Sequence, residues 1–453
     1  MRGISGRRLL QAGATTPGRM LLTGVALILI SLLAGLFAVL AVADRAGAAR
    51  SVDNGSGPLG VDTQEIYRAL ADADATAAAG LLEGGVESDT VRQVYQNAID
   101  TAARNLIKAG SAGVSEKEKD ELTKIGTQLP VYASLVERAK AETRQGNTVG
   151  AAYLRAASNN VMRKEILPAA EKLHTMAQQR LVDDHDDATS KPWVPIVLLL
   201  ISLVAIAASL LFFAKRTRRR INVGLLIAGV GTLVSVVWLW TGTDSSRADL
   251  DRSKRDGWGP VEKLAQARFQ SLRAHGDESL TLVMRGSDNG SYEEDFKDAW
   301  TLLMGGPEVK ARPASEDGPA IKGRPAAIGA LVEAEKMSRS DPETRAKILA
   351  AQTAAAEWLK AHESVTKLYD SGRFKEAVSL VTKADGASRV AFARVEAALD
   401  EAVAEDQQDF ENSVTSGRKA LNGLEIGVGV LALVAAAAIV DGVRREVGRY
   451  NRP

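Results

Sequence analysis

The chain has 453 residues, a length typical of two or three domains. Its 57 Lys and Arg residues nearly balance 56 Asp and Glu residues, which argues against a nucleic-acid-binding protein because such proteins normally carry a basic excess. The absence of cysteine excludes disulfides, a thiolate nucleophile and cysteine metal sites.

The N-terminal part predicts a short tail and a membrane anchor. Residues 1–19 contain several arginines, and residues 20–43 are apolar with no ionisable side chain. About 20 helical residues cross the hydrocarbon core of a bilayer. The sequence AVAD at residues 41–44 resembles a signal-peptide cleavage site. We favour an uncleaved anchor, because the apolar region of a signal peptide has only about 7–15 residues.

Residues 44–192 predict a first helical bundle. Tyr67, Leu70, Asp74 and Ala77 follow one another at spacings of three and four, which is the apolar seam of an amphipathic helix. We find no run of alternating β-branched residues here that would predict a strand. We therefore expect antiparallel helices that return to the membrane, with the helix broken at Pro192 and Pro195.

Asp74 is a candidate site residue of this bundle, because it lies on an otherwise small or apolar seam. A buried carboxylate needs a partner. Asp74 either binds a cationic group of a ligand or partner, or it forms an internal structural pair with an arginine such as Arg155.

His185 lies in the acidic sequence DDHDD, residues 183–187. The cluster is a weak candidate for a divalent-cation site or a pH sensor. The alternative is that these acidic residues are simply exposed to solvent next to the membrane. Acidic residues on the outer side agree with the bias of positive charges toward the cytoplasm. No other metal site is predicted.

Two further spans enclose a short basic turn. Residues 193–214 and 221–241 are apolar without an ionisable residue, and the turn at 215–220 contains Lys215, Arg216, Arg218, Arg219 and Arg220. Basic residues next to spans face the cytoplasm. The turn therefore fixes the topology, and contact with a cytosolic partner or with anionic membrane lipid is a possible second role.

Residues 242–422 predict a second bundle that repeats the first. An offset of 202 in residue number aligns Tyr67 with Phe269, and an offset of 226 aligns the stretch from Gln145 with the stretch from Ser371. About 24 additional residues in the second copy are expected within 305–327, a loop rich in Pro and Gly. The pattern indicates an internal duplication.

His362 is a candidate site residue of the second bundle. It lies next to Trp358 on a seam with 3–4 spacing, where a histidine is either a satisfied core residue or a ligand contact. From Ala387 onward, the sequence predicts one long helix toward the membrane, with an interruption at Gly417 or Gly423.

Residues 423–441 predict a fourth span, with Glu425 and Asp441 near its ends, and residues 442–453 form an arginine-rich tail. All three basic clusters then fall on one side, so both termini are expected in the cytoplasm of a multi-pass cell-membrane protein. The predicted fold is an all-α membrane protein with four transmembrane helices and two tandem extracytoplasmic helical bundles.

No motif predicts an enzyme or a cofactor. The chain has no Gly-rich phosphate loop with its Lys and Ser or Thr, no HExxH and no GxSxG. A transporter is disfavoured because the spans carry almost no charge and show no pair of broken helices.

Two stretches resemble a known family. DADATAAAGLLEGGVESDTVRQVYQNAIDTA (72–102) and AAYLRAASNNVMRKEILPAAEKL (151–173) are similar to the actinobacterial GlnX-type four-span membrane proteins of the GlnH–GlnX–PknG amino-acid signalling system. The resemblance implies a solute-binding lipoprotein as the partner outside and a cytosolic serine/threonine kinase as the partner inside. It assigns no ligand-binding residue to this chain.

The sequence therefore favours a transmembrane signal relay that couples an extracytoplasmic amino-acid signal to the kinase. The alternative is a scaffold for envelope assembly without ligand-driven switching. A homo-oligomer is compatible with either interpretation.

Overall fold

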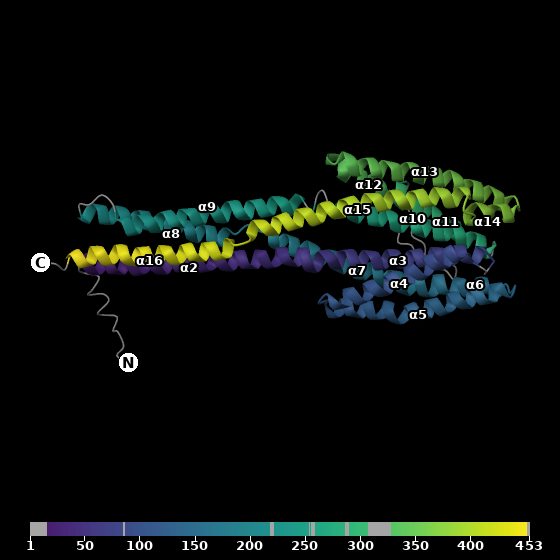
Figure 1. Cartoon of the computed structure of the whole chain (residues 1–453), viewed down its shortest axis with the longest axis horizontal. Helices are drawn as coiled ribbons and strands as arrows, with labels where there is room; N and C mark the ends of the chain where they lie inside the picture. The colour runs from purple at the N-terminus through teal and green to yellow at the C-terminus, as the bar shows by residue number, and fades with distance from the viewer. Residues whose placement is uncertain are drawn as a thin grey trace. The chain divides into compact units, whose positions relative to one another are not determined.

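The computed structural model describes residues 16–84, 87–217, 222–252, 254, 259–285, 290–306 and 328–450. The structure is 92% helical, and its described part contains no strand, which confirms the predicted all-α class. The chain divides into two units (Figure 1). The membrane unit consists of Met1–Asp53, Asp183–Asp251 and Ser413–Pro453, and the bundle unit consists of Asn54–Val182 and Arg252–Asn412.

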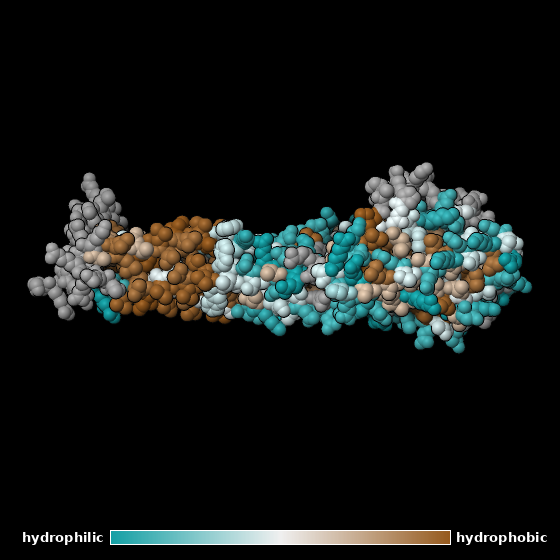
Figure 2. Space-filling model, turned by 90° about the horizontal axis from the view of Figure 1, so that it is seen from above, coloured by the Kyte–Doolittle hydropathy of each residue, from teal (hydrophilic) through white to brown (hydrophobic). Residues whose placement is uncertain are grey.

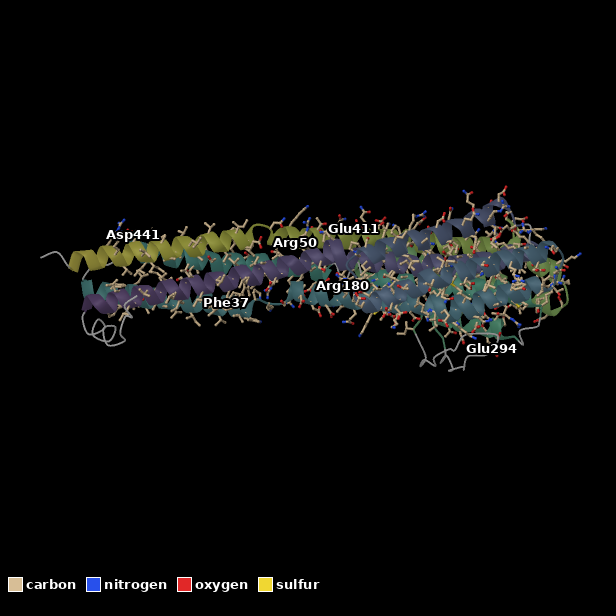
Figure 3. The ribbon with its side chains drawn as sticks, turned by 90° about the horizontal axis from the view of Figure 1, so that it is seen from below. Phe37, Arg50, Arg180, Glu294, Glu411 and Asp441 are labelled. Atoms are coloured by element: carbon tan, nitrogen blue, oxygen red, sulfur yellow. The ribbon has the colours of Figure 1, made fainter. Side chains whose placement is uncertain are left out.

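The membrane unit contains one long helix for each predicted span. These helices are α2 (Thr16–Ser51), α8 (Trp193–Thr217), α9 (Val223–Arg252) and α16 (Leu424–Tyr450). Each belongs to a helical stretch long and apolar enough to cross a membrane. Figure 2 shows apolar side chains gathered over this unit, and Phe37 on α2 points outward from it at 45% exposure (Figure 3). Such a surface suits contact with lipid.

Small residues allow these helices to approach closely. A Cβ atom on Gly35 of α2 would lie 2.3 Å from the Ala432 Cβ of α16, and one on Gly427 would lie 2.3 Å from the Trp238 ring of α9. Packing through small residues is the usual way in which helices associate in lipid, where the hydrophobic effect between helices is absent.

The bundle unit holds the remaining helices. They are α3 (Gly57–Leu82), α4 (Asp89–Ser111), α5 (Glu116–Arg144), α6 (Val149–Arg155), the π-helix η2 (Ala156–Ile166), α7 (Leu167–Thr189), α10 (Gly259–Met284), α11 (Ser291–Met304), α12 (Ala330–Met337), the 3₁₀-helix η4 (Ser338–Ser340), α13 (Pro342–Asp370), α14 (Phe374–Thr382) and α15 (Ala387–Leu421). The last residues of α7 and α15 belong to the membrane unit. A further π-helix, η1 (Val52–Ser56), joins α2 to α3 without a break in the helical backbone.

Local signals fix where two of the bundle helices begin. Ser115 caps α5 in a capping box with Glu118, and Asp341 accepts hydrogen bonds from the first backbone N–H groups of α13. The apolar seams supply the core, in which Leu70 of α3 and Trp358 of α13 are fully buried. The caps therefore set the starts of α5 and α13, and the seams set which helix faces are buried.

The helices of the two halves correspond in position along the chain. Helices α3 and α10 each have 26 residues, and both of their ends align at the offset that pairs Tyr67 with Phe269. Helices α5 and α13 each have 29 residues, and both of their ends align at the larger offset. Helix α3 packs along α10, where the Tyr67 and Phe269 rings lie 4.3 Å apart between centroids. Most of the loop predicted at 305–327 lies outside the described residues.

The predicted helix breaks are correct in part. Helix α7 ends at Thr189 and α8 begins at Trp193, so the chain breaks at Pro192, but Pro195 lies in the first turn of α8, where proline is tolerated. Helix α15 ends just before Gly423, whose φ is 77°. Gly417 lies inside α15, so it does not interrupt the helix as the sequence suggests.

Candidate functional site

Asp74 is buried in the bundle unit, as its place on the seam predicts. The Ser158 hydroxyl donates a hydrogen bond to Asp74 Oδ2 at 2.7 Å, and the Tyr132 hydroxyl donates to Oδ1 at 3.3 Å. The arginine that faces the carboxylate is Arg163, with its Nε 3.6 Å from Oδ2, and not Arg155 as the sequence suggests. Burial raises the pKa of Asp74, while Arg163 and the hydroxyl hydrogen bonds oppose the shift.

Arg163 joins the two halves of the bundle unit. Its Nη1 donates to Asp277 Oδ1 of α10 at 2.5 Å and lies 4.0 Å from Asp295 Oδ2 of α11. Arg273 of α10 lies 3.5 Å from Asp295. We call Asp74, Arg163, Arg273, Asp277 and Asp295 the buried ionic cluster.

The buried ionic cluster carries more negative than positive groups. Three carboxylates face two guanidinium groups, and burial of such an excess charge is costly unless a proton is bound. Burial raises the pKa of Asp277 to about 7; Arg163 and Arg273 oppose this shift, and the neighbouring Asp295 adds to it. The cluster is therefore expected to bind a proton near neutral pH.

The π-helix η2 explains why Arg163 reaches the cluster. Its 11 residues supply Arg163 to the cluster and Ser158, which donates to Asp74. They also include Asn159, whose side-chain amide donates to the Tyr292 hydroxyl at 2.7 Å. A π-helix changes the angular spacing of side chains, and short π segments are frequent at functional sites. Regular α-helical spacing therefore does not predict which side chains of η2 face Asp74.

His362 lies in a second buried group, formed with Glu278 and Glu293. His362 Nδ1 lies 2.9 Å from Glu278 Oε1, and Nε2 lies 3.2 Å from Glu293 Oε2. Burial alone would lower the pKa of His362, but the two carboxylates outweigh it and raise the pKa to about 9. Burial would raise the pKa of Glu278, yet His275, whose Nδ1 lies 3.7 Å from Glu278 Oε2, and the hydrogen bond with His362 lower it to about 2. His362 is therefore a charged, internally paired core residue.

His185 is held between helices of the membrane unit. It is 4% exposed, and its Nε2 lies 3.2 Å from the Leu250 carbonyl oxygen and 3.8 Å from Asp251 Oδ1. In the described part of the chain, no group of three or more His, Asp or Glu side chains is arranged to hold a metal ion. These contacts show that His185 of α7 packs against the C-terminal end of α9.

The predicted cytoplasmic contact residues lie at the edge of the described chain. Lys215 and Arg216 belong to the last turn of α8, and Arg218, Arg219 and Arg220 lie outside the described residues. Their role stays a prediction.

A cavity of about 480 Å³ in the bundle unit was not predicted from the sequence. Four helices line it: α3, α7, α10 and α15. Its lining consists of Val61, Gln64, Glu65, Tyr67, Arg68, His174, Ala265, Gln266, Arg268, Phe269, Asp400, Val403 and Ala404. Tyr67 and Phe269, which the offset of 202 aligns in the sequence, both line the cavity, and their rings lie 4.3 Å apart between centroids.

The comparisons with known proteins place part of the chain in a described class. Residues 48–186 match the family model of an actinobacterial sensor domain. The match supports an actinobacterial sensor protein, and it covers less than half of the chain. The matched segment contains Asp74 and Arg163, but not the three members of the buried ionic cluster from the second half. Neither the curated proteins nor the solved structures give a significant match.

Proposed function

We propose that the protein is a transmembrane signal relay. An extracytoplasmic amino-acid signal, delivered by a solute-binding lipoprotein, changes the packing of the bundle unit. The change passes through the membrane helices to the basic turn, where a cytosolic serine/threonine kinase responds. The lipoprotein and the kinase enter through the resemblance of residues 72–102 and 151–173 to GlnX-type proteins.

One observation carries the proposal. The sensor-domain match begins at residue 48, within α2, so the matched segment starts in the same helix that contains the first apolar run. The helical backbone then continues through η1 and α3 to Leu82. Because a continuous helix transmits small axial shifts, a displacement of about 1–2 Å in the bundle has a direct route to the membrane segment.

We also propose that the two halves arose by duplication. The support is that whole helices correspond, since α3 matches α10 and α5 matches α13 at both ends and in length. The starts of α4 and α11 also align at the smaller offset, 202 residues. The additional residues of the second half therefore lie between the start of α11 and the start of α13. A duplicated sensor provides two similar bundles whose contact surface can shift.

In the proposed relay, the packing of the two halves changes between two arrangements at the buried ionic cluster. The cluster joins η2 and α3 of the first half to α10 and α11 of the second half through charge pairs. A signal changes such an equilibrium only through different affinities for the two arrangements, and a tenfold bias corresponds to about 1.4 kcal/mol.

The kinase part of the proposal is tested by recovery of the partner. Tagged full-length protein is purified from membranes solubilised in mild detergent, and bound serine/threonine kinases are identified by mass spectrometry. In the test variant, Arg218, Arg219 and Arg220 are each changed to Ala. The relay predicts that a kinase is recovered with the wild type and is largely lost with this variant.

The matched control removes three exposed basic side chains of the bundle unit, with Arg104, Lys117 and Lys119 each changed to Ala. The control should recover as much kinase as the wild type. Equal recovery with the turn variant would remove the turn from the mechanism. The scaffold alternative instead predicts that the bundle unit melts at the same temperature with and without amino acids or their binding protein.

A further inference from the structure

The 480 Å³ cavity of the bundle unit has the size of a small-molecule site, since such sites measure about 300–1,000 Å³. Its apolar lining comes from Val61 of α3, Ala265 of α10, and Val403 and Ala404 of α15. The Tyr67 and Phe269 rings form an aromatic wall in it, 4.3 Å apart between centroids. The proposed relay does not use this cavity.

Both arginines of the lining are already paired with carboxylates. Arg68 binds Glu65 through Nε and Nη2, and its Nη1 lies 3.9 Å from Asp72. Arg268 binds Asp400 through Nη1, and its Nε lies 3.3 Å from Glu396. The two arginines act on common neighbours, because the charges of both lower the pKa of Asp72 against the rise caused by burial.

Carboxylates outnumber guanidinium groups around these two arginines. Four carboxylates, those of Glu65, Asp72, Glu396 and Asp400, face two guanidinium groups. Glu65 and Asp400 line the cavity, whereas Asp72 and Glu396 are not among its lining residues, and burial raises the pKa of both. A ligand carboxylate would be a fifth anion beside arginines that are already paired, whereas a ligand cation would reduce the surplus. His174 adds no positive charge, because burial lowers its pKa to about 4.

Two of the four carboxylates are accessible to a ligand. The Asp400 side chain is 56% exposed and the Glu65 side chain is 35% exposed, and both line the cavity. A carboxylate accepts several hydrogen bonds, so each can bind a cation without releasing its arginine. Aromatic faces attract organic cations as well.

We propose that this cavity binds a small organic cation, a primary or quaternary amine, between the Glu65 and Asp400 carboxylates and the Tyr67 and Phe269 rings. The ligand bridges α3 of the first half and α10 and α15 of the second half. Because it contacts both halves, it favours the arrangement in which they are packed as described. This binding goes beyond the amino-acid signal and the kinase, and does not depend on either.

Isothermal titration calorimetry on the full-length protein in detergent tests the proposal. The cationic probes are butylamine, tetramethylammonium and 1,4-diaminobutane. Norvaline and valerate are matched in size to butylamine, one as a zwitterion and the other as an anion. We expect at least one cation to bind saturably with a dissociation constant of about 1 mM or below, and norvaline and valerate to bind at least about tenfold more weakly.

Two variants assign the binding to this cavity. Asp400→Asn removes an accessible carboxylate and should weaken the best cation about tenfold. Ala404→Phe fills the cavity from an exposed position without changing any charge, and it should abolish binding while the protein still melts cooperatively. The matched control is Glu357→Gln, because Glu357 is 49% exposed and paired with Arg394 at 2.9 Å, away from the cavity lining.

The proposal is overturned if none of the three cations binds, or if norvaline or valerate binds as tightly as the best cation. It is also overturned if cation binding is unchanged in both cavity variants. Loss of kinase recovery in the turn variant together with absent cation binding would leave the relay intact and remove only this site.

Discussion

Arg163 connects the two halves of the bundle unit through charge pairs. Its guanidinium faces Asp74 of its own half and Asp277 and Asp295 of the other half, and its side chain is 6% exposed. Burial opposes the charge of Arg163, but the three carboxylates outweigh it and raise its pKa. Arg163 therefore stays charged at every pH at which the protein is folded.

Removal of this charge should be strongly destabilising. Arg163→Met leaves three carboxylates buried with one guanidinium, and breaking a buried pair in this way costs about 3–5 kcal/mol. Thermal melting followed by circular dichroism measures the loss. Lys164→Met, which changes an exposed neighbour on the same helix, is the control and should melt like the wild type. Equal melting of the two variants would show that Arg163 does not hold the halves together.

The raised pKa of Asp277 predicts a pH dependence of the free energy of unfolding. The carboxyl has a pKa of about 7 in the folded protein against 3.8 in the unfolded chain, so the folded state binds the extra proton between these values. This contribution to stability is complete below pH 3.8 and is lost as the pH rises through 7. Asp277→Asn takes up no proton there, so its melting temperature should fall less than that of the wild type between pH 5 and pH 8. Parallel curves for the two proteins would contradict the assignment.

The His362–Glu278 pair should make the free energy of unfolding depend on pH at both high and low pH. The folded pKa of His362, about 9, lies above its ordinary 6.5, so its contribution is complete below pH 6.5 and is lost as the pH rises through 9. The folded pKa of Glu278, about 2, lies below its ordinary 4.5, so its contribution is complete above pH 4.5 and is lost as the pH falls through 2.

His362→Gln should therefore be most destabilising between pH 4.5 and 6.5, by about 3 kcal/mol, because it leaves a buried carboxylate without its charged partner. The difference from the wild type should shrink as the pH approaches 9. Chemical denaturation at several pH values measures it. A difference that is constant from pH 6 to pH 9 would mean that His362 is not charged in the folded protein.

At the scale of elements, the packing of α2 against α16 depends on a glycine. A Cβ on Gly35 would come within 2.3 Å of the Ala432 Cβ, so Gly35→Ala should cost about 1–3 kcal/mol through overpacking. The exchange Gly35→Ala with Ala432→Gly moves the methyl group to the other helix and should restore most of the melting temperature. Failure of the exchange to restore it would show that the two helices do not meet at these residues.

The sequence predicted those elements whose signals are local. The seam through Leu70 and Asp74 correctly placed Asp74 inside a helix and buried. Pro192 and Gly423 correctly marked breaks, because proline restricts its own φ and glycine accepts a positive φ, which is 77° at Gly423. Arg155 was one example of an arginine that could pair with Asp74, and the arginine that faces this carboxylate is Arg163. Arg163 lies on η2, which departs from α-helical spacing, and no local signal in the sequence announces this departure.

The candidate cavity could not be predicted for a different reason. Its lining comes from four helices that belong to both halves of the chain, and the alignment of the two halves paired Tyr67 with Phe269 without indicating that the two rings touch. The charge surplus also depends on which carboxylates stand beside Arg68 and Arg268, and these pairs include one separated by 128 residues, Arg268 with Glu396. Such pairs exist only after the helices have packed.

At the scale of the whole molecule, the proposed relay requires the two bundles to face the exterior and the basic turn to face the cytoplasm. The proposed relay depends on this topology, since the signal and the kinase must meet opposite faces of the membrane. Because the chain has no cysteine, a single introduced cysteine is the only thiol available to a maleimide reagent. Positions 120 and 343 are exposed on α5 and α13. Position 218 belongs to the basic turn that the sequence predicts at residues 215–220.

The most direct test is therefore the labelling of intact cells with a membrane-impermeant maleimide. The variants are Asp120→Cys, Glu343→Cys and Arg218→Cys, each analysed before and after the membrane is permeabilised. We expect Asp120→Cys and Glu343→Cys to be labelled on intact cells, and Arg218→Cys to be labelled only after permeabilisation. Labelling of Arg218→Cys on intact cells, or protection of Asp120→Cys and Glu343→Cys until permeabilisation, would contradict this topology.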